Sequence, residues 1–99
     1  MWYAIITEDH DDSLSMRMAA RPDHVARLKA LCEEDRLLIA GPHPSIDSPD
    51  PGDAGFSGSL VVVDFNSLSQ AKKWAQADPY VAAGVVKNVV VKPFNRVLP

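Results

Sequence analysis

One histidine stands among the apolar residues of an expected helix, where an ionisable side chain is uncommon. Val25, Leu28, Leu31 and Cys32 recur at helical spacing and form one apolar stripe. At about 100° per residue His24 falls inside that stripe. A titratable ring directed inward must find a partner, stay neutral or move protons. Two interpretations of His24 follow: a general acid/base, or a core histidine hydrogen-bonded to the backbone.

Two arginines precede His24 at spacings that bring them to its side of the chain. If the helical wheel is extended backward, Arg17 and Arg21 lie within about 60° of His24. Guanidinium groups beside a cleft can bind a carboxylate or a phenolate through paired hydrogen bonds. The alternative is that these arginines are solvated at the surface or pair with the acidic run 8–12.

Asp78 stands before a proline at the expected start of a short helix, where an aspartate is an ordinary N-cap. Two more residues are candidates for ligand contact. Ser59 begins a strand, and Tyr80 could line the same cleft, although aromatic packing beneath a short helix explains Tyr80 equally well.

The sequence predicts four strands and two helical segments in the order β-α-β-β-α-β. Aromatic and β-branched residues predict strands over residues 2–7, 37–41, 59–65 and 85–94. This order is typical of the ferredoxin-like α+β fold, in which two helices pack on one face of an antiparallel sheet. The runs 60–63 and 89–91 are apolar on both sides, whereas a sheet covered on one face alternates. A second copy of the same sheet is the simplest cover, so we expect a homodimer.

Prolines, glycines and capping residues set the expected ends of the helices. We expect a short helix over 14–20, a separate helix beginning at Pro22, one over 67–77, and one or two turns between 78 and 84. The residue before Pro22 is expected to leave the helix, because the proline ring disfavours helical geometry there. Ser67 and Gln70 form a capping box. The proline-rich stretch 41–58 is the longest irregular segment, and in so small a domain such a loop is usually a lid, an interface arm or disordered.

Composition and charge narrow the class of protein. With 99 residues, 46% of them hydrophobic, the chain predicts a single globular domain over 1–99. A net charge of −3 gives no support for nucleic-acid binding, and no apolar run approaches the roughly 18–20 residues of a membrane span. The lack of a signal sequence and the single cysteine, Cys32, agree with a reducing cytoplasm. Because Cys32 lies on the apolar stripe, we interpret it as a core residue rather than a nucleophile.

Other patterns that could carry chemistry are weaker. The run 8–12 contains acidic residues and His10, but consecutive ligands on a short turn rarely converge on one metal ion, so a solvated charged turn is favoured. His43 lies between two prolines and is expected in a loop. No Gly-x-Ser-x-Gly elbow surrounds Ser59, and neither Rossmann nor P-loop spacing occurs. We therefore expect neither a metal nor a cofactor.

Several short motifs in a fixed order resemble the YciI-like (YCII-related) family of small bacterial proteins. They run nearly end to end: Arg17, Arg21-Pro22-x-His24, Arg27-Leu28, Arg36-Leu37-Leu38, Gly41-Pro42, Ala54-Gly55-Phe56-x-Gly58-Ser59, Ala77-Asp78-Pro79-Tyr80-Val81, Ala83-Gly84-Val85 and Val91-Lys92-Pro93-Phe94. The resemblance implies a dimeric α+β barrel, in which two ferredoxin-like subunits pack sheet to sheet. It also implies a cleft with a histidine–aspartate dyad proposed as catalytic, which by position would be His24 and Asp78. In that dyad the Asp78 carboxylate would accept the second ring N–H of His24 and fix the tautomer of the imidazole. This role is compatible with an N-cap, because one carboxylate has an oxygen for each. One relative is regarded as removing chloride from a hydroxyquinol-type ring, and the wider superfamily includes muconolactone isomerases.

Residues and resemblance together predict a cytoplasmic homodimer that performs acid/base catalysis without a cofactor on a small anionic, cyclic or aromatic molecule. In this hypothesis His24 moves the proton and Asp78 orients the imidazole. The substrate-binding residues would be Arg17, Arg21, Ser59 and Tyr80. Isomerisation, elimination and dehalogenation need only a proton moved at carbon and an oxyanion stabilised. The alternatives are a non-catalytic ligand-binding or accessory dimer, and a structural subunit of a larger enzyme.

Overall fold

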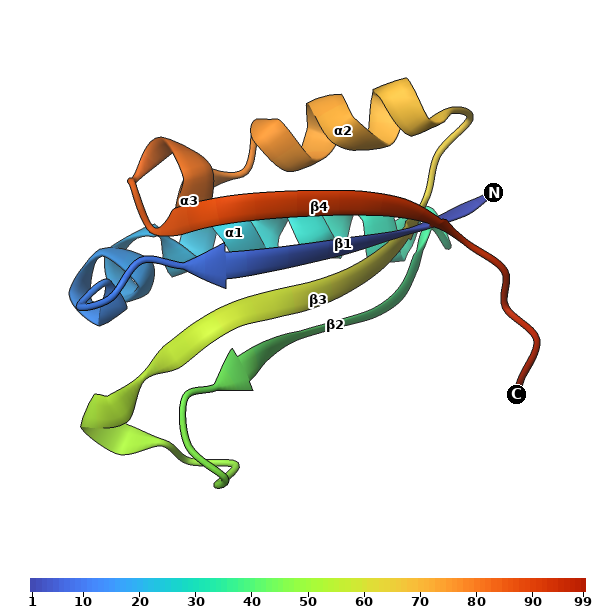
Figure 1. Cartoon of the computed structure of the whole chain (residues 1–99). Helices are drawn as coiled ribbons and strands as arrows, with labels where there is room; N and C mark the ends of the chain where they lie inside the picture. Colours follow the sequence, from blue (N-terminus) through green and yellow to red (C-terminus); the bar gives the residue numbers. More distant parts are fainter.

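A four-stranded antiparallel sheet carries all the helices on one of its faces (Figure 1). The computed structural model describes every residue from Met1 to Pro99. The elements are β1 (Trp2–Asp9), α1 (Leu14–Glu33), β2 (Leu37–Pro44), the 3-10 turn η1 (Gly52–Ala54), β3 (Phe56–Asp64), α2 (Leu68–Gln76), α3 (Pro79–Ala82) and β4 (Val86–Phe94). The strand order is β2-β3-β1-β4. This is the ferredoxin-like arrangement, so the predicted α+β fold is confirmed.

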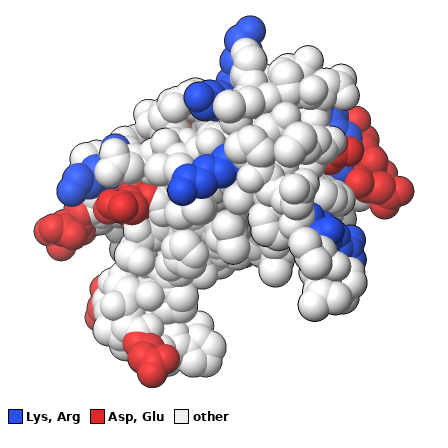
Figure 2. All heavy atoms as spheres, turned by 45° about the vertical axis from the view of Figure 1, so that its right-hand side comes forward, with Lys and Arg blue, Asp and Glu red and all other residues white.

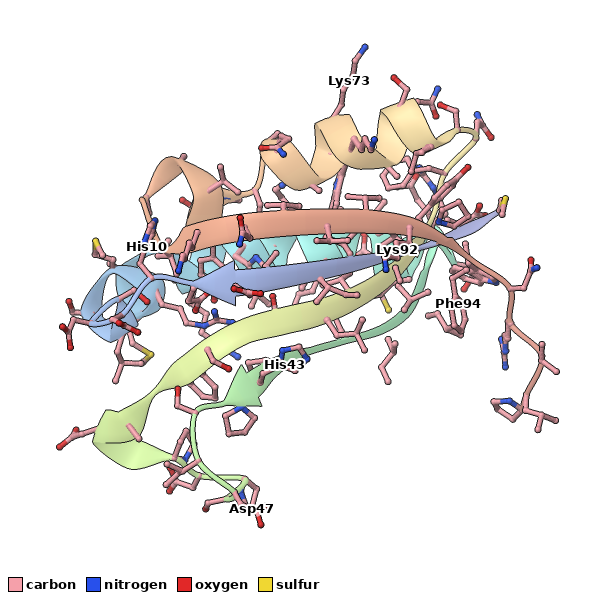
Figure 3. The ribbon with its side chains drawn as sticks, viewed as in Figure 1. His10, His43, Asp47, Lys73, Lys92 and Phe94 are labelled. Atoms are coloured by element: carbon pink, nitrogen blue, oxygen red, sulfur yellow. The ribbon has the colours of Figure 1, made fainter.

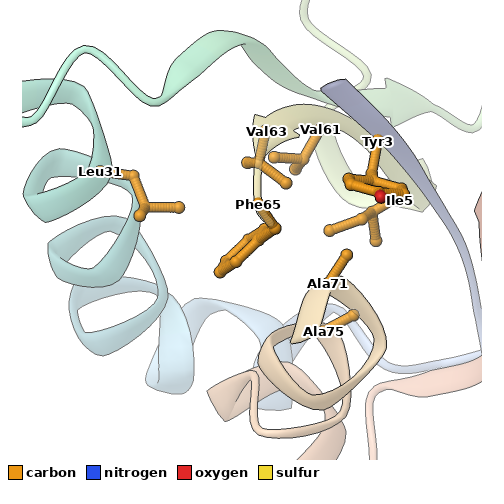
Figure 4. Packing of buried hydrophobic residues seen from close by; sticks show 8 residues of the cluster. All are labelled: Tyr3, Ile5, Leu31, Val61, Val63, Phe65, Ala71 and Ala75. Carbon is orange, nitrogen blue, oxygen red and sulfur yellow. The ribbon is translucent and has the colours of Figure 1, made fainter. Parts of the chain in front are cut away.

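The hydrophobic core lies between the sheet and the helices (Figure 4). The central strands pair so that Tyr3 lies opposite Val63 and Ile5 opposite Val61. All four of these side chains point toward the helices and are at most 5% exposed. The remaining members of the core cluster are Leu31 from α1, Phe65, and Ala71 and Ala75 from α2. Burying each of the large side chains stabilises the fold by about 1.5–3 kcal/mol.

The opposite face of the sheet is apolar and carries no helix (Figure 1). Ile6 on β1 pairs across the ladders with Leu60 and Val90, and Ile39 pairs with Val62. Ile6, Ile39 and Val90 are 37%, 57% and 43% exposed. The lack of alternation in the strand sequences therefore corresponds to apolar side chains on both faces of the sheet, one of them open.

The prediction that Pro22 begins a new helix is wrong, because α1 runs unbroken from Leu14 to Glu33 with Pro22 inside it. Proline removes the amide that would bond the carbonyl of Met18. Pro22 and Met18 are both exposed, so water can satisfy that carbonyl without breaking the helix. One continuous helix places three buried residues two turns apart in a row: Arg17, His24 and Leu31.

The predicted bounds of the proline-rich stretch are wrong. The predicted irregular stretch 41–58 is shorter, because β2 continues through Pro42 to Pro44 and β3 begins at Phe56. Prolines are tolerated there because β2 is an edge strand.

Cys32, which the sequence places in the core, is exposed. The buried row of α1 is narrow, and Cys32 is turned about 100° from Leu31.

The predicted N-cap of α2 is confirmed, but the returning contact of a capping box, from the Gln70 side chain to the Ser67 amide, is not formed. The Ser67 hydroxyl accepts the amide of Gln70 at 3.1 Å and begins α2. Gly84 has a φ of +77°, which suits the end of the last helical turn.

No helix is both long and apolar enough to cross a membrane. On the face shown in Figure 2, basic and acidic side chains are scattered among uncharged atoms.

Candidate functional site

A cavity of about 290 Å³ lies between α1, the strands β2 and β3, and the short helix α3. Its walls include five of the six residues that the sequence singled out: Arg17, Arg21, His24, Ser59 and Tyr80. Leu28, Ala40 and Val61 contribute to its apolar side. The sixth residue, Asp78, borders a small adjoining cavity that His24 and Tyr80 also line. The fold therefore gathers residues that lie as much as 63 positions apart in the sequence.

His24 is held by Asp78 through one ring nitrogen. Nδ1 lies 2.9 Å from each carboxylate oxygen of Asp78, and the two side chains are 9% and 15% exposed. A carboxylate can only accept, so in the neutral ring Nδ1 carries the proton and Nε2 holds a lone pair. Nε2 has no hydrogen-bond partner within the chain, and His24 lines the cavity. A ring of this tautomer can accept a proton at Nε2 and return it.

Asp78 serves the helix and the histidine together. Its Oδ1 accepts the amide of Tyr80 at 2.8 Å, which is the N-cap interaction of α3. The two roles that the sequence left open are therefore both present in the geometry. Because the cap fixes the carboxylate at the start of α3, Asp78 presents its oxygens to Nδ1 without having to be ordered on ligand binding.

Tyr80 packs flat against His24. The ring centroids are 3.9 Å apart and the planes differ by 17°. Tyr80 is 3% exposed, and burial raises the pKa of its phenol, so the hydroxyl stays protonated at neutral pH. Tyr80 thus contributes both a packing surface and a neutral hydroxyl at the cavity.

Arg17 forms a buried ion pair with Asp9, at the end of β1. The two side chains are 6% and 0% exposed. The interpretation of 8–12 as a solvated turn is therefore wrong for Asp9, because β1 runs to Asp9 and a bulge against β4 falls between Glu8 and Asp9. The sequence left open whether Arg17 is solvated at the surface or pairs with the acidic run 8–12. In the structure it pairs with Asp9 of that run.

Burial raises the pKa of Asp9 above its ordinary value of 3.8, and the nearby Arg17 opposes this only in part. The folded chain therefore binds the Asp9 proton more tightly than the unfolded chain does. The contribution of Asp9 to stability is full below the unfolded-state pKa and is lost as pH rises through the higher folded-state pKa.

The free energy of unfolding should therefore depend on pH through Asp9 and should rise on acidification. Between about pH 7 and about pH 4 the wild type should gain stability relative to Asp9→Asn, which cannot titrate. Urea unfolding of both proteins at several pH values measures the difference. A wild type that loses stability relative to the variant on acidification would show that the ion pair, not burial, dominates.

Arg21 differs from Arg17 although both line the cavity. It lies one turn further along α1, is exposed, and makes no salt bridge or side-chain hydrogen bond within the chain. It is therefore the cation at this cavity whose donors are not already engaged. A guanidinium in this state can offer a bidentate contact to an anionic oxygen.

Ser59 is fixed by Thr7 on the neighbouring strand. The two hydroxyl oxygens are 2.8 Å apart, and the Ser59 amide donates to the Thr7 hydroxyl at 3.1 Å. Gly58 permits this approach, because a Cβ there would stand 1.8 Å from the carbonyl oxygen of Thr7. The buried Ser59 hydroxyl is thus held at the cavity wall.

Gly58→Ala is expected to destabilise the fold by about 1–3 kcal/mol, because the methyl group must displace the backbone of β1. Gly41→Ala is the matched control, since nothing lies within 4 Å of a Cβ at that position and it is also in a strand. Denaturant unfolding gives both values. Equal effects of the two substitutions would contradict the close contact.

Sequence reasoning did not assign a role to three residues near the site. The sequence pattern places Asp9 in a charged turn and Thr7 at the end of a strand, and it indicates no further role for either residue. Arg27 donates to the carbonyl of Trp74 at 2.8 Å and lies over the Trp74 ring at 4.4 Å. Burial lowers the pKa of Arg27, and the charge of Asp78 opposes this shift. Arg27 follows His24 by three residues on α1, and this i, i+3 spacing was the available signal.

The other two histidines, which are labelled in Figure 3, do not line the cavity. His10 follows β1 near the start of α1, and His43 lies on β2, paired with Gly58. Both are exposed. No group of three His, Cys, Asp or Glu side chains has a geometry that could hold a metal ion.

Comparisons with known proteins agree with this fold. The chain matches the YCII-related domain family over residues 1–95. It is 57% identical to Protein YciI of Escherichia coli and 52% identical to an uncharacterized protein of Haemophilus influenzae. Each alignment covers 98% of this chain and 99% of the relative.

A solved structure is similar at much lower identity. The 5-chloro-2-hydroxyhydroquinone dehydrochlorinase TftG of Burkholderia phenoliruptrix, in complex with 2,5-dihydroxybenzoquinone, superposes with a TM-score of 0.83 at 22% identity. The match covers 97% of this chain and 95% of that one. At this identity the similarity concerns the fold. The family match and the two sequence relatives show that this chain belongs to the YCII-related family.

Proposed function

We propose that this protein is an acid/base enzyme acting on a small anionic, cyclic or aromatic molecule by an isomerase, lyase or dehalogenase type of reaction. The carrying observation is that His24 is bonded to Asp78 at Nδ1 while Nε2 has no partner at the cavity. An imidazole held in this way can take a proton from a ligand and return it without changing its own orientation.

The cavity fits a substrate of one ring. Its volume of about 290 Å³ is at the lower end of ligand sites, which suits a single ring with a few substituents. Leu28, Ala40 and Val61 would contact the apolar part of such a molecule. Arg21 would hold an ionised oxygen, with Ser59 and Tyr80 as neutral hydroxyl groups nearby. The chemistry proposed for His24 and Asp78 is proton transfer alone and needs no cofactor.

The structural neighbour suggests which reaction to test first. Its name describes loss of hydrogen chloride from 5-chloro-2-hydroxyhydroquinone. In such a reaction a proton is removed and the chloride ion leaves with the electron pair of the carbon–chlorine bond, so no oxidant is required. His24 would carry the proton, and Arg21 would stabilise the ring oxygen that becomes negative.

The test is chloride release from 5-chloro-2-hydroxyhydroquinone by the purified protein, measured with a chloride electrode. Binding of 2,5-dihydroxybenzoquinone, the ligand of the neighbour, is measured in parallel by calorimetry. Chloride released faster than without protein supports the proposal. Binding of the quinone without any chloride release would favour the alternative, a ligand-binding or accessory protein that uses the same cavity.

We also propose that two copies pair through the open face of the sheet. Ile6 and Val90 are cross-strand neighbours on this face, and Ile39 lies on the same face opposite Val62. All three expose apolar side chains, and a large exposed apolar patch is rare on a protein that stays monomeric. A second copy would bury the same residues on both partners. The lone cysteine Cys32, which cannot form an internal disulfide, suits the reducing cytoplasm that we propose as the compartment.

The dimer has a direct test. Val90→Asp should convert a wild-type dimer into a monomer in analytical ultracentrifugation, because each copy would bury a carboxylate without a partner at the interface. Ile46→Asp is the control, since Ile46 is 52% exposed but lies in the loop after β2 rather than on the sheet. A monomeric wild type, or dissociation by both substitutions, would contradict pairing through this face.

A further inference from the structure

A stack of side chains ends on the imidazole of His24. The guanidinium carbon of Arg17 lies 4.5 Å from the centre of the Tyr80 ring, and the His24 ring lies 3.9 Å from the same centre. Arg17 and His24 are two turns apart on α1, about 10.5 Å along the helix axis. The Tyr80 ring is thus in close contact with both side chains, and it links Arg17 to His24.

Asp9 fixes the far end of this stack. Its carboxylate pairs with Arg17, and both side chains are more than nine-tenths buried. The guanidinium also lies 5.4 Å from the centre of the Phe56 ring. If Arg17 swung away to bind a ligand, Asp9 would be left as a buried charge without a partner. Arg17 is thus committed to the protein, whereas Arg21 is not.

The stack supplies a restraint that the carboxylate does not. The Nδ1 contact with Asp78 favours one setting of χ2, but the χ2 minima of histidine are broad, so the plane of the ring can still tilt while the hydrogen bond is kept. A flat neighbour 3.9 Å away limits this rotation. Holding the plane of the ring also holds the direction of Nε2.

We propose that the Asp9–Arg17 pair is the positioning unit of the site. It keeps Tyr80 against His24, and so keeps Nδ1 on Asp78 and Nε2 open to the cavity. The proposal deepens the function proposed above and rests on it. It assigns different roles to the two arginines: Arg17 is a positioning residue, and Arg21 contacts the ligand.

The test compares Arg17→Gln with Arg21→Gln in the full-length protein by NMR. A proton above an aromatic ring is shielded, so stacking on Tyr80 moves the His24 ring-proton signals away from those of free histidine. Arg17→Gln should return the signals toward free histidine, and Arg21→Gln should leave them in place. Arg21→Gln should instead weaken binding of 2,5-dihydroxybenzoquinone about tenfold, as expected for one lost charge-assisted contact.

Substitutions of Tyr80 keep the proposal testable if Arg17→Gln does not fold. Tyr80→Phe retains the ring and should leave the His24 signals shielded. Tyr80→Leu should return the His24 signals toward those of free histidine while the Asp9–Arg17 ion pair stays formed. Unchanged His24 signals in Tyr80→Leu or in a folded Arg17→Gln protein would overturn the proposal, as would a loss of shielding in Arg21→Gln. These readouts do not depend on turnover, so absent chloride release would contradict the proposed reaction while leaving the result for the stack intact.

Discussion

Replacing His24 by glutamine is expected to slow chloride release from 5-chloro-2-hydroxyhydroquinone by about 10²–10⁴-fold, the usual contribution of a positioned general acid/base. Glutamine keeps a polar side chain of similar reach that can still donate to Asp78, but it cannot take up a proton near neutral pH. The measurement is the initial rate of chloride release at equal protein concentration, with circular dichroism to confirm that the variant is folded.

His43→Gln is the matched control for this substitution. His43 is exposed on the edge strand β2 and does not line the cavity, so its loss should leave the rate unchanged. If both variants retain the wild-type rate, His24 is not the proton carrier. If both lose it equally, the effect is not specific to the imidazole of His24.

Arg17→Ala is expected to lower the free energy of unfolding by about 3–5 kcal/mol, because it leaves the Asp9 carboxylate buried without its partner. The loss is large against the roughly 5–15 kcal/mol that stabilises a domain of this kind. One oxygen of Asp9, Oδ1, already has no hydrogen-bond partner, so Arg17 supplies the ion-pair contact on which the other oxygen depends. Urea unfolding followed by circular dichroism measures the change.

Glu34→Ala provides the comparison at the surface. Glu34 pairs with Arg36 at 3.4 Å, but its side chain is 57% exposed, so this loss should stay below about 1 kcal/mol. The two pairs differ chiefly in burial, because the side chains of Arg17 and Asp9 are 6% and 0% exposed and those of Arg36 and Glu34 are 32% and 57% exposed. An Arg17→Ala protein as stable as Glu34→Ala would mean that the Asp9–Arg17 pair contributes little, and the positioning proposed for it would lose its basis.

The sequence predicts the fold well where local chemistry decides the structure. Ser67 caps α2 and Gly84 ends the last helical turn because each conformation depends on a side chain or on its absence at one position. The buried row that contains His24 follows from helical spacing alone. The proximity of Asp78 to His24 came from the family resemblance, because 54 residues separate the two and periodicity relates only neighbours.

The failures occur where tertiary context overrides local preference. Pro22 stays inside α1 because its exposed side lets water replace the missing amide. Pro42 continues β2 because that strand is at the sheet edge. Asp9 is buried because Arg17 lies above the end of β1, a contact that no pattern within 8–12 reveals. Each outcome depends on what lies opposite the residue, and this is information that a single sequence does not contain.

The ¹⁵N spectrum of the His24 ring, recorded before and after addition of 2,5-dihydroxybenzoquinone, reports which ring nitrogen carries the proton and which one meets the ligand. The arrangement predicts that in the neutral ring Nδ1 carries the proton and Nε2 does not, and that the ligand shifts the Nε2 signal while Nδ1 stays bonded to Asp78. A neutral ring that carries its proton on Nε2, or an Nε2 signal that does not respond to the bound ligand, would contradict a proton-transfer role for this imidazole.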